Sequence, residues 1–223
     1  GQRETIRRLA RLGRAPEQLT GILVTHEHGD HVGGVFPFAR RHGLPVWLSH
    51  GTSSACQSAA QGVELRIIDC AAVFCVEALE VQPFPVPHDA REPLQFVFSD
   101  GNKRLGLLTD AGEITRHMRD MLSGVDGLIL ECNHDAGMLA SSSYPLSLQK
   151  RIAGRLGHLA NDAAANLLRE IDSSRLQHIV AAHLSEQNNH PSLAVSALAT
   201  VLGFANERIG VAGQEAGFDW RQL

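Results

Sequence analysis

The most informative part of the sequence is Thr25-His26-Glu27-His28-Gly29-Asp30-His31, which follows directly on the apolar run Gly21-Ile22-Leu23-Val24. The apolar run predicts a buried strand, so the polar stretch begins where that strand ends. Three imidazoles and two carboxylates lie within six positions. Neutral imidazole and carboxylate are the side chains that bind zinc, manganese or iron at neutral pH. The stretch therefore predicts a metal site at the end of a strand.

The spacing of these donors predicts how they divide between ions. His26 and His28 are two positions apart, so in extended backbone their side chains point the same way and one ion can take both. Gly29 lets the chain turn, and Asp30 and His31 then enter a helix whose first turn faces back to the same place. A second ion can take that pair. A polar loop with surface histidines is the alternative, and the density of the pattern disfavours it.

Further donors stand at the ends of apolar runs later in the chain, and they are His88, Asp110 and His183. Together with the first motif they resemble the metal-binding signature of the metallo-β-lactamase fold. The resemblance implies an α/β protein, a four-layer αβ/βα sandwich, with a one- or two-metal site in the cleft between its sheets. It also implies how the ligands divide. One ion would be held by His26, His28 and His88, and the other by Asp30, His31 and His183, with Asp110 bridging the two.

The start of the sequence departs from this family. Proteins of this fold normally begin with two or three strands of the first sheet, whereas this sequence begins with a helix expected over residues 2–12. We therefore expect a single metallo-β-lactamase-fold domain over residues 1–223 that lacks those opening strands and is N-terminally incomplete relative to the family. A sheet without them would expose a long edge, which affects independent stability more than site chemistry.

Length, composition and charge limit the class of protein to which the chain can belong. The chain has 223 residues, 43% of them hydrophobic, and a net charge of −4, which indicates a globular protein without a strongly basic surface. No apolar run approaches the length of a membrane span, and no secretory signal opens the sequence. The four cysteines form no C-x-x-C spacing, which favours free thiols in a reducing compartment. We expect a cytoplasmic protein with no membrane partner.

The hydrophobic pattern alternates between strands and helices, which favours α/β layering. A helix is expected over residues 33–43, with Gly43 as its stop. Asn161 is expected to cap a later helix. The expected strands cover residues 45–48, 65–68, 72–76, 79–86, 94–99, 105–109, 127–131, 178–182 and 209–214.

A second group of polar residues follows one of the later buried strands. Asn133-His134-Asp135 stands at the strand end, where a turn or capping cluster is the alternative to a site. A helical stretch then carries Lys150, Arg151 and Arg155, for which a solvated basic face is the alternative. His158 precedes the next helix, beside these cations. That is a setting in which a phosphate can bind.

These motifs narrow the resemblance to the YycJ/WalJ-type branch of metallo-β-lactamase-fold proteins. That branch is associated with 5′-to-3′ exonuclease activity on DNA. The wider pattern also resembles tRNA 3′-processing endonucleases, in which a histidine set like His158 assists the leaving group. Ala160 and Cys132 depart from the branch, where serine is common at both positions. The stretches that carry the resemblance are 131–135, Tyr144-Pro145, 157–161, 182–185 and 209–214.

The donor set and the resemblance together favour phosphodiester hydrolysis with two divalent ions, Zn2+ or Mn2+. Asp110 would bridge the ions, and a metal-activated hydroxide would attack phosphorus. Asp30 would orient that hydroxide or accept its proton, while His158, or else His134, would protonate the departing oxygen. The nucleic-acid backbone would be followed by Lys150, Arg151 and Arg155. We expect a nucleic-acid substrate, with DNA favoured over RNA.

Other functions share parts of this pattern. A glyoxalase II-like thioesterase shares all seven metal ligands, but it would need neither His158 nor the Asn133-His134-Asp135 cluster. A small-molecule phosphodiesterase is closer to the predicted function, because it hydrolyses the same kind of bond. An inactive metal-binding regulatory module has less use for an open two-metal site. A β-lactamase is disfavoured, because cysteine usually stands there at the position of Asp110 and those enzymes are exported.

Overall fold

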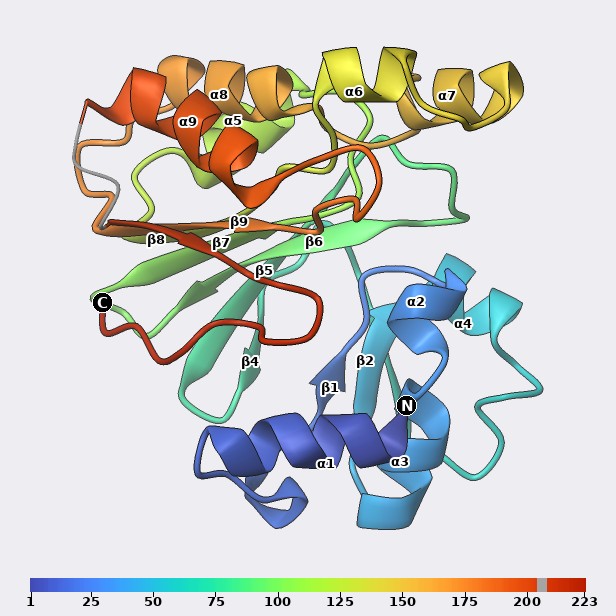
Figure 1. Cartoon of the computed structure of the whole chain (residues 1–223). Coiled ribbons are helices and arrows are strands. Elements are labelled where there is room, and N and C mark those ends of the chain that lie inside the picture. The colour runs from blue at the N-terminus through green and yellow to red at the C-terminus, as the bar shows by residue number, and fades with distance from the viewer. Residues whose placement is uncertain (204–207) are drawn as a thin grey trace.

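The apolar runs of the sequence assemble into two sheets that face each other, in a computed structural model that describes residues 1–203 and 208–223. Helices cover the outer side of each sheet, so that α5, α8 and α9 lie over the larger sheet while α1 and α3 lie beneath the smaller one (Figure 1). The order of layers is therefore helices, sheet, sheet, helices. This confirms the four-layer αβ/βα sandwich that the sequence predicts.

The larger sheet has the strand order β10-β9-β8-β7-β6-β5-β4. Neighbouring strands from β4 to β7 are antiparallel, and those from β7 to β10 are parallel. The parallel strands β8 and β9 are covered on both faces, which explains their almost unbroken apolar sequence. The strand bounds are β4 (Phe74–Val76), β5 (Leu79–Pro85), β6 (Leu94–Ser99), β7 (Arg104–Leu108), β8 (Gly127–Glu131), β9 (His178–Ala182) and β10 (Ile209–Val211).

The smaller sheet consists of three parallel strands in the order β1-β2-β3 within the described part of the chain. They are β1 (Ile22–Leu23), β2 (Val46–Ser49) and β3 (Leu65–Ile68). The strand β1 is short and stands at one edge, and it leads directly into the histidine-rich motif. The smaller sheet therefore delivers the first metal-binding candidates from its edge strand.

The helices alternate with the strands as expected. Their bounds are α1 (Gln2–Arg11), α2 (Gly29–Val32), α3 (Val35–His42), α4 (His50–Ala55), α5 (Arg116–Leu122), α6 (Ala136–Ala140), α7 (Leu146–Ile152), α8 (Asn161–Glu170) and α9 (Pro191–Leu202). The helix expected over residues 33–43 is α3, and it ends at Gly43 in the left-handed conformation, with φ 66°. None of the helices in the described residues has both the length and the apolar character needed to cross a membrane.

Apolar side chains fill the spaces between the layers. One cluster lies between the larger sheet and its helices, with Met118 and Leu122 of α5 against Leu128 of β8. A second joins the two sheets, where Trp47 of β2 packs with Phe96 of β6. A third lies under the smaller sheet, around Phe36, Phe38 and Leu48. Burial of this apolar surface is the main stabilising contribution to the fold.

One sequence expectation about a helix start is wrong. Asn161 does not cap α8 but is its first residue, and Ala160 takes the capping position without a side-chain hydrogen bond. The Asn161 side chain instead exchanges hydrogen bonds with Asn189 at 2.9 and 3.0 Å. A buried tertiary partner therefore outweighs the local capping preference. The late strand expected over residues 209–214 is shorter and ends at Val211.

The carboxyl ends of β1, β5, β7, β8 and β9 point to one region between the sheets. Asp110 follows β7 and His183 follows β9, and both residues have a left-handed backbone, with φ 54° and 56°. Such a conformation costs of order 1 kcal/mol for a residue other than glycine and is concentrated at functional sites. The backbone thus turns sharply at these two positions and directs both side chains away from their strands.

The backbone before His158 packs closely against the end of α7, where Gly157 leaves no room for a side chain. An added Cβ at Gly157 would lie 2.1 Å from the carbonyl oxygen of Ile152 and 2.3 Å from that of Arg151. We expect Gly157→Ala to lower the free energy of unfolding by about 1–3 kcal/mol, because backbone must move to admit the methyl group. Urea denaturation measures this. Gly210→Ala is the control, since its nearest atom is a side-chain carbon at 3.4 Å, and an equal loss in both variants would contradict the explanation.

Candidate metal centre

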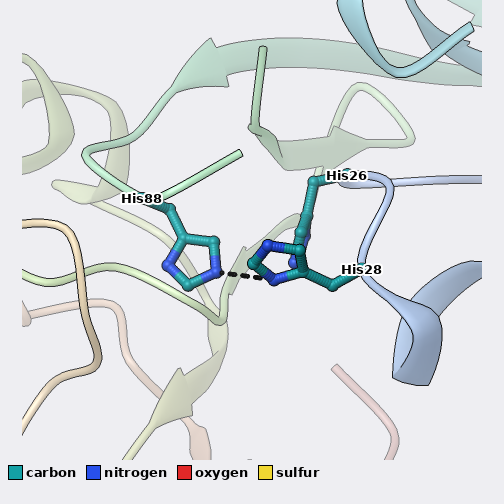
Figure 2. A group of neighbouring side chains, drawn as sticks. All are labelled: His26, His28 and His88. Carbon is teal, nitrogen blue, oxygen red and sulfur yellow. Dashed lines mark hydrogen bonds between the residues drawn. The ribbon is translucent and has the colours of Figure 1, made fainter. Parts of the chain in front are cut away.

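Three imidazoles converge beyond β1 and β5. Figure 2 shows the rings of His26, His28 and His88 turned toward one another, with His28 Nδ1 3.2 Å from His88 Nε2. One nitrogen from each ring lies within 4.8 Å of the others, which is close enough for all three to bind a single ion. His26 and His88 are buried, and His28 faces the solvent side of the group. The three histidines from two distant parts of the chain therefore form a ready donor set.

The other nitrogen of each ring is held by a protein group. His26 Nδ1 lies 3.0 Å from the Thr25 hydroxyl, and His88 Nδ1 lies 2.9 Å from the carbonyl oxygen of Gly157. His28 Nε2 lies 3.2 Å from the carbonyl oxygen of Asp89. These acceptors favour a proton on the nitrogen that they contact, which leaves the facing nitrogen with a free lone pair. The surroundings thus select the tautomer that a metal ligand requires.

A second set of donors lies beside the first. Asp30, His31 and His183 offer one ligand atom each within the same 4.8 Å limit. His31 Nδ1 lies 3.2 Å from the same Thr25 hydroxyl that contacts His26. One threonine oxygen therefore positions a ring of each set, as an acceptor for both ring N–H groups.

Asp110 stands between the two sets. One of its carboxylate oxygens lies 3.1 Å from His31 Nε2, and the other lies 3.4 Å from His183 Nδ1 and 3.9 Å from His88 Nε2. It also groups with His26 and His31 as a possible set of ligands. The carboxylate is 1% exposed, so its charge faces imidazoles rather than water.

The chemistry of these atoms fits divalent cations. Across residues 1–203 and 208–223, the buried atoms His26 Nε2, His31 Nε2 and Asp110 Oδ2 have no partner in hydrogen-bond geometry. Buried polar atoms without a partner are costly, and a cation would satisfy all three. Burial lowers the pKa of His26 to about 3, so this ring is a neutral donor at neutral pH. Burial opposes ionisation of Asp110, but the neighbouring histidines outweigh it and hold the pKa of the carboxyl well below its usual range.

Glu131, at the end of β8, is the residue of the site whose function the sequence did not reveal. One of its oxygens lies 2.8 Å from His158 Nδ1 and 3.0 Å from His183 Nδ1. The other accepts hydrogen bonds from the backbone N–H groups of Ala111 and Leu159, at 3.0 and 3.1 Å. Burial opposes ionisation of the fully buried Glu131, but the two histidines outweigh it and lower its pKa. The sequence feature that could have predicted this role is a carboxylate at the end of an apolar strand, because such a group is rarely buried without partners.

A cavity of about 520 Å³ opens over the donor groups. It exposes members of both sets together with His158, so the same space reaches the candidate ligands and a further imidazole. Its size and polar character suit a small charged group rather than a lipid or an apolar cofactor. The lining residues are His28, Asp30, Asp110, Asn133, Tyr144, Arg151, Ile152, His158, His183, Leu184, Ser185, Glu186, Gln187 and Gln214.

The remaining sequence candidates have different positions. His134 is 2% exposed and does not line this cavity, and burial lowers the pKa of its ring. Arg151 lines the cavity and its Nε lies 2.7 Å from an oxygen of Asp89. Arg155 pairs with Glu113 at 2.7 Å on the surface, outside the cavity.

Lys150 is exposed on α7 and also lies outside the cavity lining. The three cations named from the sequence therefore separate. Lys150 and Arg151 are consecutive on α7 and face different directions, and Arg155 is not on the expected helical stretch, because α7 ends at Ile152.

The four contacts of Glu131 give a test by substitution. We expect Glu131→Gln to lower the free energy of unfolding by about 3–5 kcal/mol, because an amide offers one acceptor oxygen and directs its own N–H groups at buried donors. Chemical denaturation of the metal-free protein measures the loss. Glu113→Gln removes a carboxylate of the exposed pair with Arg155 and should change stability little. Similar losses in the two variants would contradict this role for Glu131.

The charge state of His183 gives a test of metal binding. Burial opposes protonation of the ring, but hydrogen bonds to Asp30 and Glu131 outweigh it and raise the pKa of His183 to about 10. The ring is therefore protonated in the metal-free protein at pH 7–9, and a metal ligand must lose that proton. We expect zinc binding to release a proton and the apparent affinity to rise about tenfold per pH unit over this range. Calorimetry in buffers of different ionisation enthalpy, with chelator competition at each pH, measures both quantities. Binding without proton release would contradict the participation of this ring.

Comparisons with known proteins show the family of this chain. The family described as "Beta-lactamase superfamily domain" matches residues 1–179. The chain is 35% identical over 187 residues to exodeoxyribonuclease YycJ of Bacillus anthracis, which covers 82% of this chain and 71% of the relative. It is 33% identical over 208 residues to exodeoxyribonuclease WalJ of Streptococcus pneumoniae, which covers 91% and 77%.

The fold is also similar to a solved structure. The metallo-β-lactamase-fold protein YhfI from Bacillus subtilis has a TM-score of 0.70 at 15% identity, covering 92% of this chain and 79% of the other. The matched family region includes the first helix, the histidine-rich motif after β1 and the strands from β1 to β8, whereas His183 lies beyond it. The protein therefore belongs to the β-lactamase superfamily and has the metallo-β-lactamase fold.

Proposed function

We propose that this chain is a metal-dependent phosphodiesterase that removes nucleotides from DNA in the 5′-to-3′ direction. One observation carries the proposal. Members of both donor sets line the same cavity as Asp110, Arg151 and His158, and His158 is held by the buried Glu131. The names of the relatives YycJ and WalJ, which are exodeoxyribonucleases, support DNA as the substrate.

The donor sets suggest which residues hold the ions. In the proposal His26, His28 and His88 bind one divalent cation, Asp30, His31 and His183 bind the other, and Asp110 contacts both. Imidazole and carboxylate ligands suit zinc and manganese. When bound, such ions neutralise phosphate oxygens and lower the pKa of a water toward neutrality.

Asp30 and Asp110 supply negative charge around the place of attack. Hydrogen bonding to His183 holds the pKa of Asp30 well below its usual range, so this carboxylate stays ionised at neutral pH. An ionised carboxylate at the cavity surface accepts a hydrogen bond from the attacking water and orients it toward phosphorus. Asp110 is fixed by its buried position and contributes orientation of the ligands.

His158 is suited to protonate the leaving oxygen. Burial opposes protonation of this ring, but the hydrogen bond from its Nδ1 to Glu131 and the charge of that carboxylate outweigh it and raise the pKa of His158. The raised pKa favours the protonated ring that a general acid needs, and the ring lines the cavity. His134 lies buried away from the cavity, so we assign the proton donor to His158.

Arg151 is suited to bind a phosphate oxygen. It is the one of the three predicted cations that lines the cavity, and its guanidinium is held beside the donors by Asp89. A guanidinium forms bidentate hydrogen bonds with phosphate oxygens. A guanidinium pairs with carboxylates as well, so Arg151 supports an anionic substrate, and the preference for a phosphodiester rests on His158 and on the relatives. A small phosphodiester remains the second candidate, since the same residues would serve it.

Hydrolysis assays with single-residue variants test the proposal. The substrates are 5′-phosphorylated single- and double-stranded DNA and RNA, with manganese or zinc, and the variants are His28→Ala and His158→Ala. We expect stepwise shortening of DNA from its 5′ end, lost in His28→Ala and slowed about 10²–10⁴-fold in His158→Ala, as for loss of a general acid.

The control variant is His117→Ala, which removes an exposed imidazole far from the cavity lining and should keep full activity. Turnover of a thioester or a small phosphodiester without cleavage of any nucleic acid would contradict the nuclease assignment. It would not contradict the assignment of the metal centre.

A further inference from the structure

Tyr144 is the single tyrosine of the chain, and the mechanism above gives it no role. It lies in the segment that connects α6 to α7, and its half-buried side chain lines the cavity of the metal centre. Among the described lining residues it is the one phenol or phenyl ring. Its position beside Arg151 therefore calls for an explanation in terms of the substrate.

The backbone around Tyr144 is fixed. The Gln149 side-chain amide donates hydrogen bonds to the carbonyl oxygens of Tyr144 and Ser142, at 2.9 and 3.2 Å. The Tyr144 N–H donates to the Ser142 hydroxyl at 3.2 Å, and Pro145 restricts the backbone of the residue before it to extended conformations. The backbone that carries the ring is thus held before any ligand arrives, which lowers the entropy lost on binding.

The cavity combines two kinds of surface. The candidate ligands, Arg151 and His158 provide charge for a phosphate, whereas Tyr144, Ile152 and Leu184 provide an aromatic and two aliphatic side chains. A phosphate alone would need only the charged part. A nucleotide carries both a charged phosphate and a flat apolar base, and bases stack on aromatic rings regardless of sequence.

We propose that Tyr144 forms a nucleobase subsite, in which its ring stacks on the base of the nucleotide whose phosphate lies at the metal centre. This inference rests on the proposed function and specifies its substrate as a nucleotide unit of a polynucleotide. Stacking would place the sugar between Tyr144 and the donors, and Arg151 would then meet a phosphate oxygen. Recognition through the face of the base predicts little preference among the four bases.

A neighbouring hollow supports a substrate longer than one nucleotide. It has a volume of about 240 Å³, is lined by Ser141, Ser142 and Ser143 of the same connecting segment, and shares Gln187 with the main cavity. The serine hydroxyls and the Gln187 amide offer hydrogen-bond donors, and a sugar or phosphate oxygen of the adjoining nucleotide is an acceptor for them.

Abasic substrates separate stacking from other effects of a substitution. The substrates are DNA strands with a normal or an abasic 5′-terminal nucleotide, and the variants are Tyr144→Ala and Tyr144→Phe. We expect Tyr144→Ala to lower kcat/KM on normal DNA about 5- to 150-fold, the range for loss of one base–aromatic stack. It should have no further effect on abasic DNA, for which the wild type is already slower. Tyr144→Phe retains the ring and should stay within about twofold of the wild type.

Leu146→Ala is the matched control, because Leu146, the first residue of α7 and two positions from Tyr144, is 72% exposed and does not line the cavity. Circular dichroism and thermal melting confirm that each variant folds. Fluorescence anisotropy with hydrolysis-resistant phosphorothioate strands and the metal-loaded protein repeats the comparison as a binding measurement without turnover. It therefore decides the inference even if the wild type does not cleave DNA, a result that by itself contradicts the proposed function.

Equal losses on normal and abasic DNA, or no loss in Tyr144→Ala, would overturn the subsite. A loss in Tyr144→Phe as large as in Tyr144→Ala would also overturn it, because the hydroxyl rather than the ring would then be responsible.

Discussion

The buried carboxylate of Glu131 is the interaction on which the rest of the centre depends. It joins the ends of three neighbouring strands, since it contacts His183 after β9 and the backbone of Ala111 after β7 from its own place on β8. It also holds His158 and the backbone beside it. A negative charge at this depth is tolerable only because four donors satisfy it. The same donors thereby become fixed relative to one another, which is the order that a metal centre needs.

The layered architecture explains why these residues can meet at all. Parallel strands deliver their carboxyl ends to one edge, and the antiparallel pair β5–β6 brings His88 to that edge from the other half of the larger sheet. The smaller sheet then contributes His26, His28 and His31 from across the cleft. Left-handed backbone at Asp110 and His183 shows local strain at the points where two strands turn toward the site. The apolar layers on either side hold this strain in place.

The electrostatic balance of the centre is that of a cation site. Several imidazoles are held with one nitrogen bound to protein and the other facing inward, and Thr25 does this for two rings at once. Asp110 and Asp30 keep low pKa values through the surrounding histidines. Hydrogen bonds to Asp30 and Glu131 raise the pKa of His183 to about 10, so this ring must lose a proton to serve as a metal ligand. Arg151 and Tyr144 lie at the rim of this charged region, where a substrate would extend away from it.

Local sequence patterns predicted the strands, their alternation with helices and the donors at strand ends, because hydrophobic period and strand-end position are local properties. It also predicted both donor sets through a family resemblance. The partners and the burial of individual side chains became known only from the tertiary structure. The partners of Glu131 come from residues up to 52 positions away, and the His134 side chain is buried. Asn161 forms hydrogen bonds with Asn189 and does not cap its helix. Of the three predicted basic residues, only Arg151 lines the cavity. Direction and burial of a side chain depend on which segments pack together, and that depends on contacts between residues far apart in the chain.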